Sequence, residues 1–278
     1  MYTLSAQEDL AHRLTYGGSR AGGTRRAGDG GRNVEGAGSA RAVPRAFLDH
    51  RGRWAPIVGV LLVLAGLKVG TAVFGVTGAV VGVIATIGVL AVTRAAQATW
   101  HDLGLSPQAL RTGLAWSLGF FSLFAAGFAL TAMAAKVLPA VAQWLQSLQV
   151  ATPEPRTLAL QAFVTIPLGT VVIEEVAFRG ALPALLGRAG AGTRTAIVGS
   201  AVLFGLWHIV PSLAAATAGS ESGTPVWLVV LGTVVFTTAS GVGLGWLRHR
   251  SRSLLPPIFV HLATNSLGVA LLWFVTLG

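Results

Sequence analysis

The chain contains no cysteine, and only 11% of its 278 residues are charged. Without cysteine it can form neither a disulfide bond nor a thiolate nucleophile. Acidic residues are especially scarce, at 10 against 20 lysines and arginines. Soluble domains usually have about a quarter of their residues charged. The sequence therefore lacks the charge expected of a soluble protein of this length.

Apolar residues are abundant instead, at 53% of the chain, and the mean hydropathy is +0.68. Several nearly uncharged stretches are long enough to cross a hydrocarbon core of ~30 Å as helices, which takes about 20 residues. Because backbone polar groups inside a bilayer must bond within their own segment, such spans are helical. We therefore expect an all-α, polytopic membrane protein.

Seven transmembrane helices are expected, together with a short interfacial helix that follows Lys136. The expected spans cover residues 55–73, 75–93, 112–135, 157–178, 195–215, 225–247 and 253–276. A polar return loop is expected at 94–111, and a kink at Pro167. In the interfacial helix, apolar residues repeat at helical spacing: Val137, Leu138, Val141, Trp144, Leu145 and Leu148.

Residues 1–54 are rich in glycine, alanine and arginine and lack an apolar period, which predicts a disordered, basic cytoplasmic tail. With the N-terminus inside, every lysine and arginine falls on the inner side except Lys68, Lys136 and Arg156. This asymmetry favours a cytoplasmic N-terminus and a multi-pass protein of the plasma (inner) membrane. It also explains the charge of +10 without a nucleic-acid partner, since no readout element is visible.

Three charged residues lie at the end of the apolar run of the fourth expected span: Glu174, Glu175 and Arg179. An ionised group inside a membrane is costly unless it is paired or functional. Residues four apart share a face of a helix, whereas neighbours diverge by about 100°. We therefore expect Glu175 to pair with Arg179, which leaves Glu174 for chemistry.

Two further pairs have the same spacing of four residues. Phe204 and His208 lie on the fifth expected span, and His261 and Asn265 lie on the seventh. Taken singly, an intramembrane histidine is as often a hydrogen-bonding partner between helices as a catalytic residue. Their occurrence on successive spans with the glutamate pair predicts a shared polar interior.

These three motifs, Glu-Glu-x-x-x-Arg, Phe-x-x-x-His and His-x-x-x-Asn, resemble the signature motifs of the CPBP family of intramembrane proteases. That family includes the type II CAAX prenyl proteases and the bacterial Abi or bacteriocin-processing proteins. The resemblance implies a catalytic core at 157–278, preceded by N-terminal transmembrane helices and the interfacial helix at 55–156. It also implies an endopeptidase that acts on a membrane-associated peptide or protein within the lipid bilayer.

The resemblance also implies a role for each motif residue. Glu174 and His208 would activate a water molecule for attack on the peptide carbonyl. His261 and Asn265 would stabilise the oxyanion that then forms. The supporting residues would be Glu175, Arg179 and Phe204.

Whether a metal takes part stays open at this point. A zinc ion bound by Glu174, His208 and His261 would have an open position for water. A metal-free mechanism in which the glutamate activates the water is the other reading, and the chain has no His-Glu-x-x-His helix. The sequence thus leaves two mechanisms for one set of residues.

Two other functions are compatible with parts of the sequence. A non-catalytic bacteriocin-immunity or scaffold protein would use the same fold to bind a membrane peptide. A transporter would show repeated halves with broken helices, and no such repeat is visible. The complete motif set favours the peptidase.

The expected boundaries conflict over membrane depth. Ending the fourth span at 178 puts Glu174 close to the inner face, whereas His208 would lie ~20 Å from that face. Tilt, a kink at Pro167 or continuation of the fourth span through Leu186 would remove the conflict.

Overall fold

A computed structural model describes residues 52–74, 78–146, 154–218 and 224–276. The contacts within the chain divide it into two units, Met1–Ala46 and Phe47–Gly278, and all described residues belong to the second. The predicted tail at 1–54 therefore lies almost wholly outside the described residues, as do the last positions of the predicted interfacial helix.

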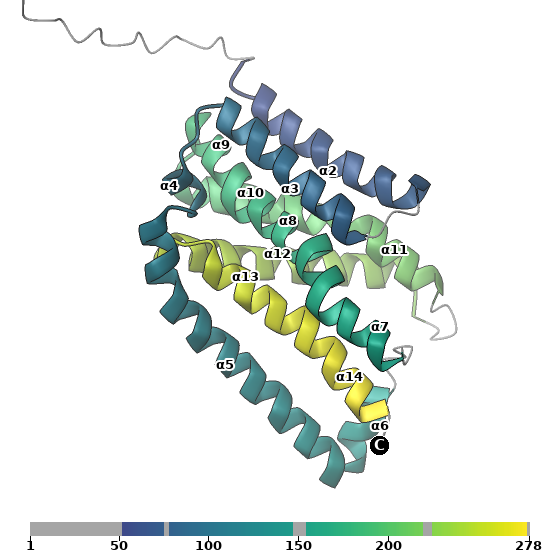
Figure 1. Ribbon diagram of the computed structural model, residues 1–278. Coiled ribbons are helices and arrows are strands. Elements are labelled where there is room, and N and C mark those ends of the chain that lie inside the picture. Colours follow the sequence, from purple (N-terminus) through teal and green to yellow (C-terminus); the bar gives the residue numbers. More distant parts are fainter. Residues whose placement is uncertain (1–51, 75–77, 147–153, 219–223, 277–278) are drawn as a thin grey trace, which may run out of the picture. The chain divides into compact units, whose positions relative to one another are not determined.

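Every regular element among the described residues is a helix (Figure 1). The first group comprises α2 (Ala55–Phe74), α3 (Gly78–Ala95), α4 (Trp100–Leu103), α5 (Pro107–Val137) and α6 (Pro139–Gln146). The second group forms one continuous helix from Pro155 to Arg188: α7 (Pro155–Leu160), η1 (Gln161–Thr165), η2 (Pro167–Val171), α8 (Val172–Glu175), η3 (Val176–Ala181) and α9 (Leu182–Arg188). The third group comprises α10 (Thr193–Trp207), α11 (Ile209–Ala218), α12 (Val226–Ser251), α13 (Leu255–Leu262), η5 (Ala263–Leu267) and α14 (Gly268–Thr276).

Five helices of the described residues are long and apolar enough to cross a membrane: Gly78–Ala95, Trp100–Val137, Pro155–Arg188, Thr193–Thr217 and Val226–Ser251. The first and last expected spans correspond to the shorter apolar helices Ala55–Gly70 and Leu255–Leu271. Many large apolar side chains, such as Leu62, Leu123 and Phe236, are exposed on these helices. The expected all-α class is confirmed for the described residues, and these long apolar helices indicate an integral membrane protein. The count of seven spans and the cytoplasmic N-terminus stay predictions.

The prediction of a return loop at 94–111 is wrong, because most of this segment is helical. Thr99 and Asp102 form a capping box around α4, in which each side chain accepts a hydrogen bond from the other residue's backbone N–H. Ser106 then caps α5, and Pro107 is its first residue. Thr99 and Ser106 thus act as N-caps of α4 and α5. The candidate membrane span here begins at Trp100, earlier than the expected 112.

The expected end of the fourth span at 178 is also wrong, because the helix continues to Arg188. Pro167, expected to kink it, opens one of its three π-helical segments. Glu174 then lies about fourteen residues, or ~21 Å, from the end at Arg188, and His208 about fifteen residues, or ~22 Å, from the start of α10. The conflict over depth disappears. Arg179 lies inside this helix rather than in an inner loop.

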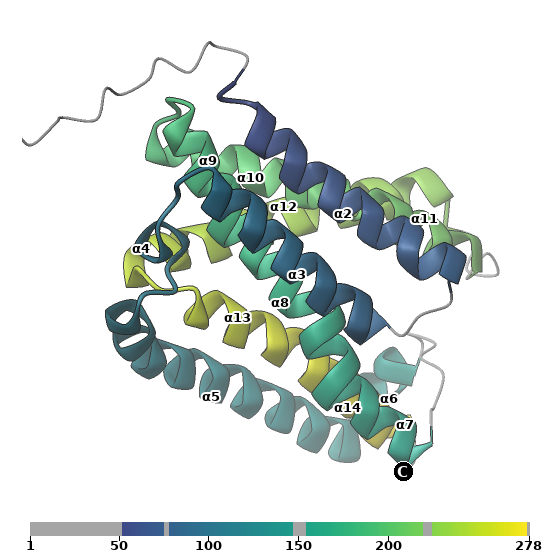
Figure 2. The ribbon, with the colours of Figure 1, turned by 45° about the horizontal axis from the view of Figure 1, so that its top comes forward.

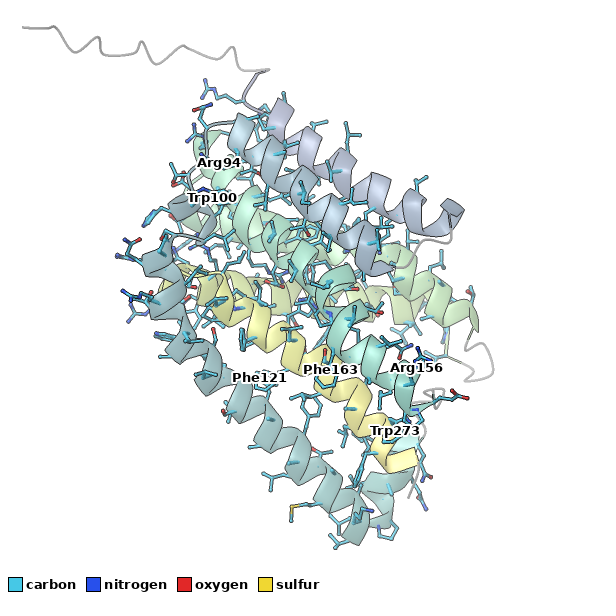
Figure 3. The ribbon with its side chains drawn as sticks, in the orientation of Figure 1. Arg94, Trp100, Phe121, Arg156, Phe163 and Trp273 are labelled. Carbon is cyan, nitrogen blue, oxygen red and sulfur yellow. The ribbon has the colours of Figure 1, made fainter. Side chains whose placement is uncertain are left out.

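The helix Pro155–Arg188 runs through the middle of the bundle, and Figure 2 shows its α8 part between α3 and α13. α2 packs on α3, α10 packs on α12, and α5 lies along α13. Figure 3 shows Phe121 of α5 facing α13, where its ring lies 6.0 Å from that of Phe259. The same view places Arg94 of α3 and Arg156 of α7 at opposite ends of the helices. Among the described residues, the buried acidic, basic and histidine side chains are Glu174, Glu175, Arg179 and His261.

Glycines allow α3 to approach the segment that leads into α8. A Cβ on Gly82 would lie 2.3 Å from the Leu168 carbonyl oxygen and 2.6 Å from the Cα of Gly169. On Gly127 of α5, which is exposed, a Cβ would meet nothing within 4 Å. The contact at Gly82 therefore fixes the helix two turns before Glu174.

We expect Gly82→Ala to destabilise the protein by about 1–3 kcal/mol, because the added methyl group overpacks a backbone contact. This corresponds to a melting temperature in detergent lower by roughly 2–12 °C. Gly127→Ala is the matched control and should leave the melting temperature unchanged or raise it slightly, since alanine favours an exposed helix. Equal melting temperatures for the two variants would contradict the close packing of α3.

Candidate active site

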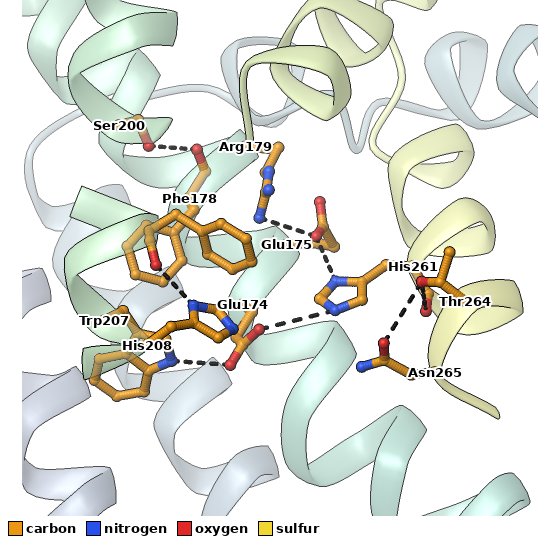
Figure 4. A network of polar contacts seen from close by, with 11 residues as sticks. Glu174, Glu175, Phe178, Arg179, Ser200, Trp207, His208, His261, Thr264 and Asn265 are labelled. Carbon is orange, nitrogen blue, oxygen red and sulfur yellow. Dashed lines mark hydrogen bonds and ion pairs between the residues drawn. The ribbon is translucent and has the colours of Figure 1, made fainter. Parts of the chain in front are cut away.

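Glu174 lies on α8 with its side chain buried, and its carboxylate has one bound and one unbound oxygen. The indole Nε1–H of Trp207 donates a hydrogen bond of 2.8 Å to Oε1 (Figure 4). Oε2 has no hydrogen-bond partner within the described part of the chain. Nε2 of His261 lies 4.0 Å from Oε2, too far for a direct hydrogen bond. One oxygen is therefore held, and the other is available to a small molecule.

Glu175 turns to the other side of the helix and is fully buried. Its Oε1 lies 3.0 Å from Nη1 of Arg179 and 2.7 Å from Nδ1 of His261. The predicted ion pair between Glu175 and Arg179 is confirmed, and His261 joins it as a third member. A carboxylate can only accept when ionised, so the Nδ1–H of His261 donates to it.

Phe204 on α10 explains how this network is packed. The guanidinium carbon of Arg179 lies 3.9 Å above the centre of its ring. The imidazole of His208 contacts the same ring edge-on at 4.6 Å, and that of His261 does so at 6.2 Å. Phe204 thus touches a residue from each of the three motifs, which supports its expected structural role.

His208 is the C-cap of α10, where the helix gives way to α11. Its Nδ1 lies 2.8 Å from the backbone carbonyl oxygen of Phe204. A carbonyl only accepts, so Nδ1 carries the proton, and Nε2 has a free lone pair when the ring is neutral. The side chain is half-buried and lines a cavity.

That cavity has a volume of about 780 Å³ and is lined by all four expected catalytic residues, Glu174, His208, His261 and Asn265. The carboxamide oxygen of Asn265 accepts a long hydrogen bond, 3.5 Å, from the neighbouring Thr264. Most of the remaining wall is apolar and comes from α5 and α12: Phe120, Phe124, Phe236, Leu244, Trp246 and Leu247. The site therefore joins a small polar end to a large apolar space.

π-helical segments coincide with the contacts that hold the long helix in place. In η3 the carbonyl oxygen of Phe178 accepts a hydrogen bond from Ser200 of α10, at 2.5 Å. In η1 the carbonyl oxygen of Ala162 accepts one from Ser266 of η5, at 2.9 Å. Such segments are often found at functional sites. Here they flank Glu174 and join its helix to the helices that carry the two histidines.

Sequence reasoning missed Trp207, Ser200 and Ser266. Trp207 precedes His208 and contacts Glu174 across 33 positions, a distance in sequence at which no spacing rule applies. The amine of Lys68 lies 4.3 Å above its indole ring, which helps to fix the ring. The one available signal was that a tryptophan stands directly beside a motif histidine.

A metal does not fit the described residues. No group of three His, Asp or Glu side chains in the described ranges is arranged to hold a metal ion. Oε2 of Glu174 and Nε2 of His261 lie 4.0 Å apart. The zinc set considered from the sequence, Glu174, His208 and His261, is therefore not assembled.

Comparison with known proteins identifies one segment. No curated protein and no solved structure matches the chain. Residues 156–267 match the model of the family described as type II CAAX prenyl endopeptidase Rce1-like, and all three motifs lie within the match. This match points to a CAAX-type intramembrane protease, a hydrolase. Residues 156–267, less than half of the chain, are thus similar to the Rce1-like family of type II CAAX prenyl endopeptidases, in agreement with the family that the motifs resemble.

Proposed function

We propose that the chain hydrolyses a peptide bond of a membrane-associated peptide, with Glu174 as the base that activates water. The observation that carries this proposal is the carboxylate of Glu174, in which Oε1 is bound by Trp207 and the buried Oε2 has no partner among the described residues. A water molecule hydrogen-bonded to Oε2 of Glu174 and to Nε2 of His208 would be held by both side chains.

In the first step the water oxygen attacks the carbonyl carbon while its proton passes to Oε2 of Glu174. His208 contributes its free Nε2 as a second acceptor that orients the water. The tetrahedral intermediate then collapses, the C–N bond breaks, and Glu174 returns the proton to the leaving nitrogen. The products are a carboxylic acid and an amine, and the enzyme regains its starting state.

The oxyanion of the intermediate would be stabilised by His261 and Asn265. The Nδ1–H of His261 binds Glu175, which fixes the ring with Nε2 towards Glu174. When Nε2 also carries a proton, it can donate that proton in a hydrogen bond to the oxyanion. The amide of Asn265 donates from the same side of the cavity.

The apolar part of the cavity supports a substrate with a hydrophobic anchor. Its volume of about 780 Å³ and its wall of phenylalanine, leucine and tryptophan residues would exclude a highly charged chain. A prenylated CAAX peptide is the first substrate to test, because the matched family is described as CAAX prenyl endopeptidases.

His208→Ala is the direct test of this assignment. We expect cleavage of the prenylated peptide by the purified protein in detergent to fall about 100-fold, since a positioned acid–base group contributes 10²–10⁴-fold. His101→Ala is the control, because His101 is an exposed histidine of α4 that lines no part of this cavity, and this variant should cleave at the wild-type rate. Unchanged cleavage in His208→Ala would remove that residue from the mechanism.

Trp207→Phe tests whether Trp207 positions the carboxylate. Phenylalanine retains a ring for Lys68 and Phe178 to contact but removes the N–H that binds Oε1. A hydrogen bond to a charged group contributes about 1.5–3 kcal/mol, so we expect kcat to fall tenfold or more while KM stays nearly unchanged. A change confined to KM would mean that Trp207 contacts the substrate instead.

A further inference from the structure

A second pocket, separate from the catalytic cavity, lies where α9 ends, α10 begins and α12 ends. It has a volume of about 370 Å³, and its lining includes Asp102, Arg179, Arg188, Thr193, Arg248 and His249. These helix ends belong to three of the candidate membrane spans, Pro155–Arg188, Thr193–Thr217 and Val226–Ser251. The pocket therefore lies at the level where a bilayer's hydrocarbon gives way to its headgroups.

Arg248 is held in a fixed orientation at this pocket. Its Nη2 donates a hydrogen bond of 2.7 Å to the backbone carbonyl oxygen of Asp102. Gly104, at a φ of 73°, leaves room for the guanidinium, because a Cβ there would lie 2.6 Å from Nε. Nε is buried and has no hydrogen-bond partner within the described residues. The guanidinium thus keeps a donor that no described group satisfies.

Two further sources of positive potential face the same space. Arg179 lines the pocket with only 1% of its side chain exposed, and its Nη2 has no hydrogen-bond partner in the described ranges. α10 begins at Thr193 without a side-chain cap, so its first backbone N–H groups and its helix dipole are available. Arg188 is exposed at the rim. The guanidinium of Arg179 is directed at Glu175 and at the ring of Phe204, so the donors available to the pocket come from α9, the start of α10 and α12.

The negative charge nearby does not cancel this potential. Asp102 is the one carboxylate among the lining residues, and its Oδ2 accepts the backbone N–H of Thr99. Glu175 balances Arg179 through the other guanidinium nitrogen, Nη1. Asp102 offsets one of the two remaining arginines, Arg188 and Arg248, so one positive charge stays in excess at the pocket. A group with several acceptor oxygens matches donors that converge from different directions.

We propose that this pocket binds a phosphate group, supplied by the headgroup of an anionic phospholipid. Basic pockets between transmembrane helices at a membrane surface bind such headgroups. The proposal concerns a site away from Glu174 and does not depend on peptidase activity. The same phosphate chemistry could also come from a free phosphate ion, which the experiment distinguishes.

The test is native mass spectrometry of the purified full chain in detergent, titrated with phosphatidylglycerol or with phosphatidylcholine. We expect the protein to bind phosphatidylglycerol more tightly than phosphatidylcholine. Arg248→Gln and Arg188→Gln should each weaken the affinity for phosphatidylglycerol about tenfold, because each removes one hydrogen bond to a charged group. Arg250→Gln removes the same charge from an exposed position of α12 that does not line the pocket, and it should change the affinity less than about twofold.

Inorganic phosphate forms the second arm of the experiment. Phosphate is added to the lipid-bound wild type and, in a separate sample, to lipid-bound Arg248→Gln. If phosphate displaces phosphatidylglycerol from the wild type but not from the variant, the pocket accepts the phosphate group from either source. The proposal would be overturned if Arg250→Gln and Arg248→Gln weakened the binding of phosphatidylglycerol equally. It would also be overturned if the wild type neither preferred phosphatidylglycerol to phosphatidylcholine nor bound phosphate. Arg188 is exposed at a helix end, so Arg188→Gln keeps the test valid if Arg248→Gln fails to fold.

Discussion

Glu174→Gln is expected to lower the rate of peptide cleavage by about 10³–10⁴-fold, the upper range for removal of a general base. Glutamine has nearly the same shape and retains an oxygen that can accept the hydrogen bond from Trp207. It has no basic oxygen at the position of Oε2, so the water is no longer deprotonated as it attacks. The measurement is the single-turnover rate on a prenylated peptide, with the purified variant in detergent.

Glu154→Gln is the matched control for this prediction. Glu154 is exposed, precedes α7 and makes no side-chain capping hydrogen bond, so the loss of its charge should leave cleavage unchanged. Melting temperatures of both variants should stay close to that of the wild type. Retention of full activity by a folded Glu174→Gln protein would contradict the mechanism. Absence of cleavage by the wild type, together with biological protection that survives Glu174→Gln, would favour the non-catalytic immunity or scaffold function.

Arg179→Leu is expected to destabilise the protein by about 3–5 kcal/mol, because it leaves the fully buried Glu175 without its cation. This corresponds to a melting temperature lower by roughly 6–20 °C. The contact with the Phe204 ring is lost as well. Thermal unfolding in detergent measures the effect, and Arg156→Leu, at an exposed position of α7, should leave the melting temperature nearly unchanged.

The double variant Glu175→Gln, Arg179→Leu separates charge from packing. It removes both charges and keeps an oxygen that can accept the Nδ1–H of His261. Replacing a buried ion pair by neutral groups is often nearly neutral for stability, so the double variant should be clearly more stable than Arg179→Leu. If both are equally unstable, the packing of Arg179 rather than its charge supports the site.

Hydropathy predicted the helical class and most helix positions, because a charge-poor stretch of about 20 residues has few alternatives to a membrane helix. The errors came from helix ends. The segment from Thr99 to Pro107 is polar enough to suggest a loop, yet its side chains cap two helices. Arg179 suggested the end of a span, although its burial beside Glu175 allows the helix to continue.

The motif residues could be predicted because spacing on a helix determines which side chains share a face. The ion pair between Glu175 and Arg179 follows from their separation of four residues. The contacts of His261 with Glu175 and of Trp207 with Glu174 join different helices. Such contacts depend on how the helices pack, which hydrophobic periodicity does not determine. Trp207 therefore became visible only in the structure.

The most direct test of the central claim is hydrolysis in water enriched in ¹⁸O. Membranes from cells that lack the protein would be incubated with the purified wild type or with Glu174→Gln, and new C-termini would be identified by mass spectrometry. We predict that membrane-anchored peptides acquire ¹⁸O-labelled C-termini with the wild type alone. The same labelled termini with both proteins, or none with either, would contradict the assignment of this chain as a peptidase that uses Glu174.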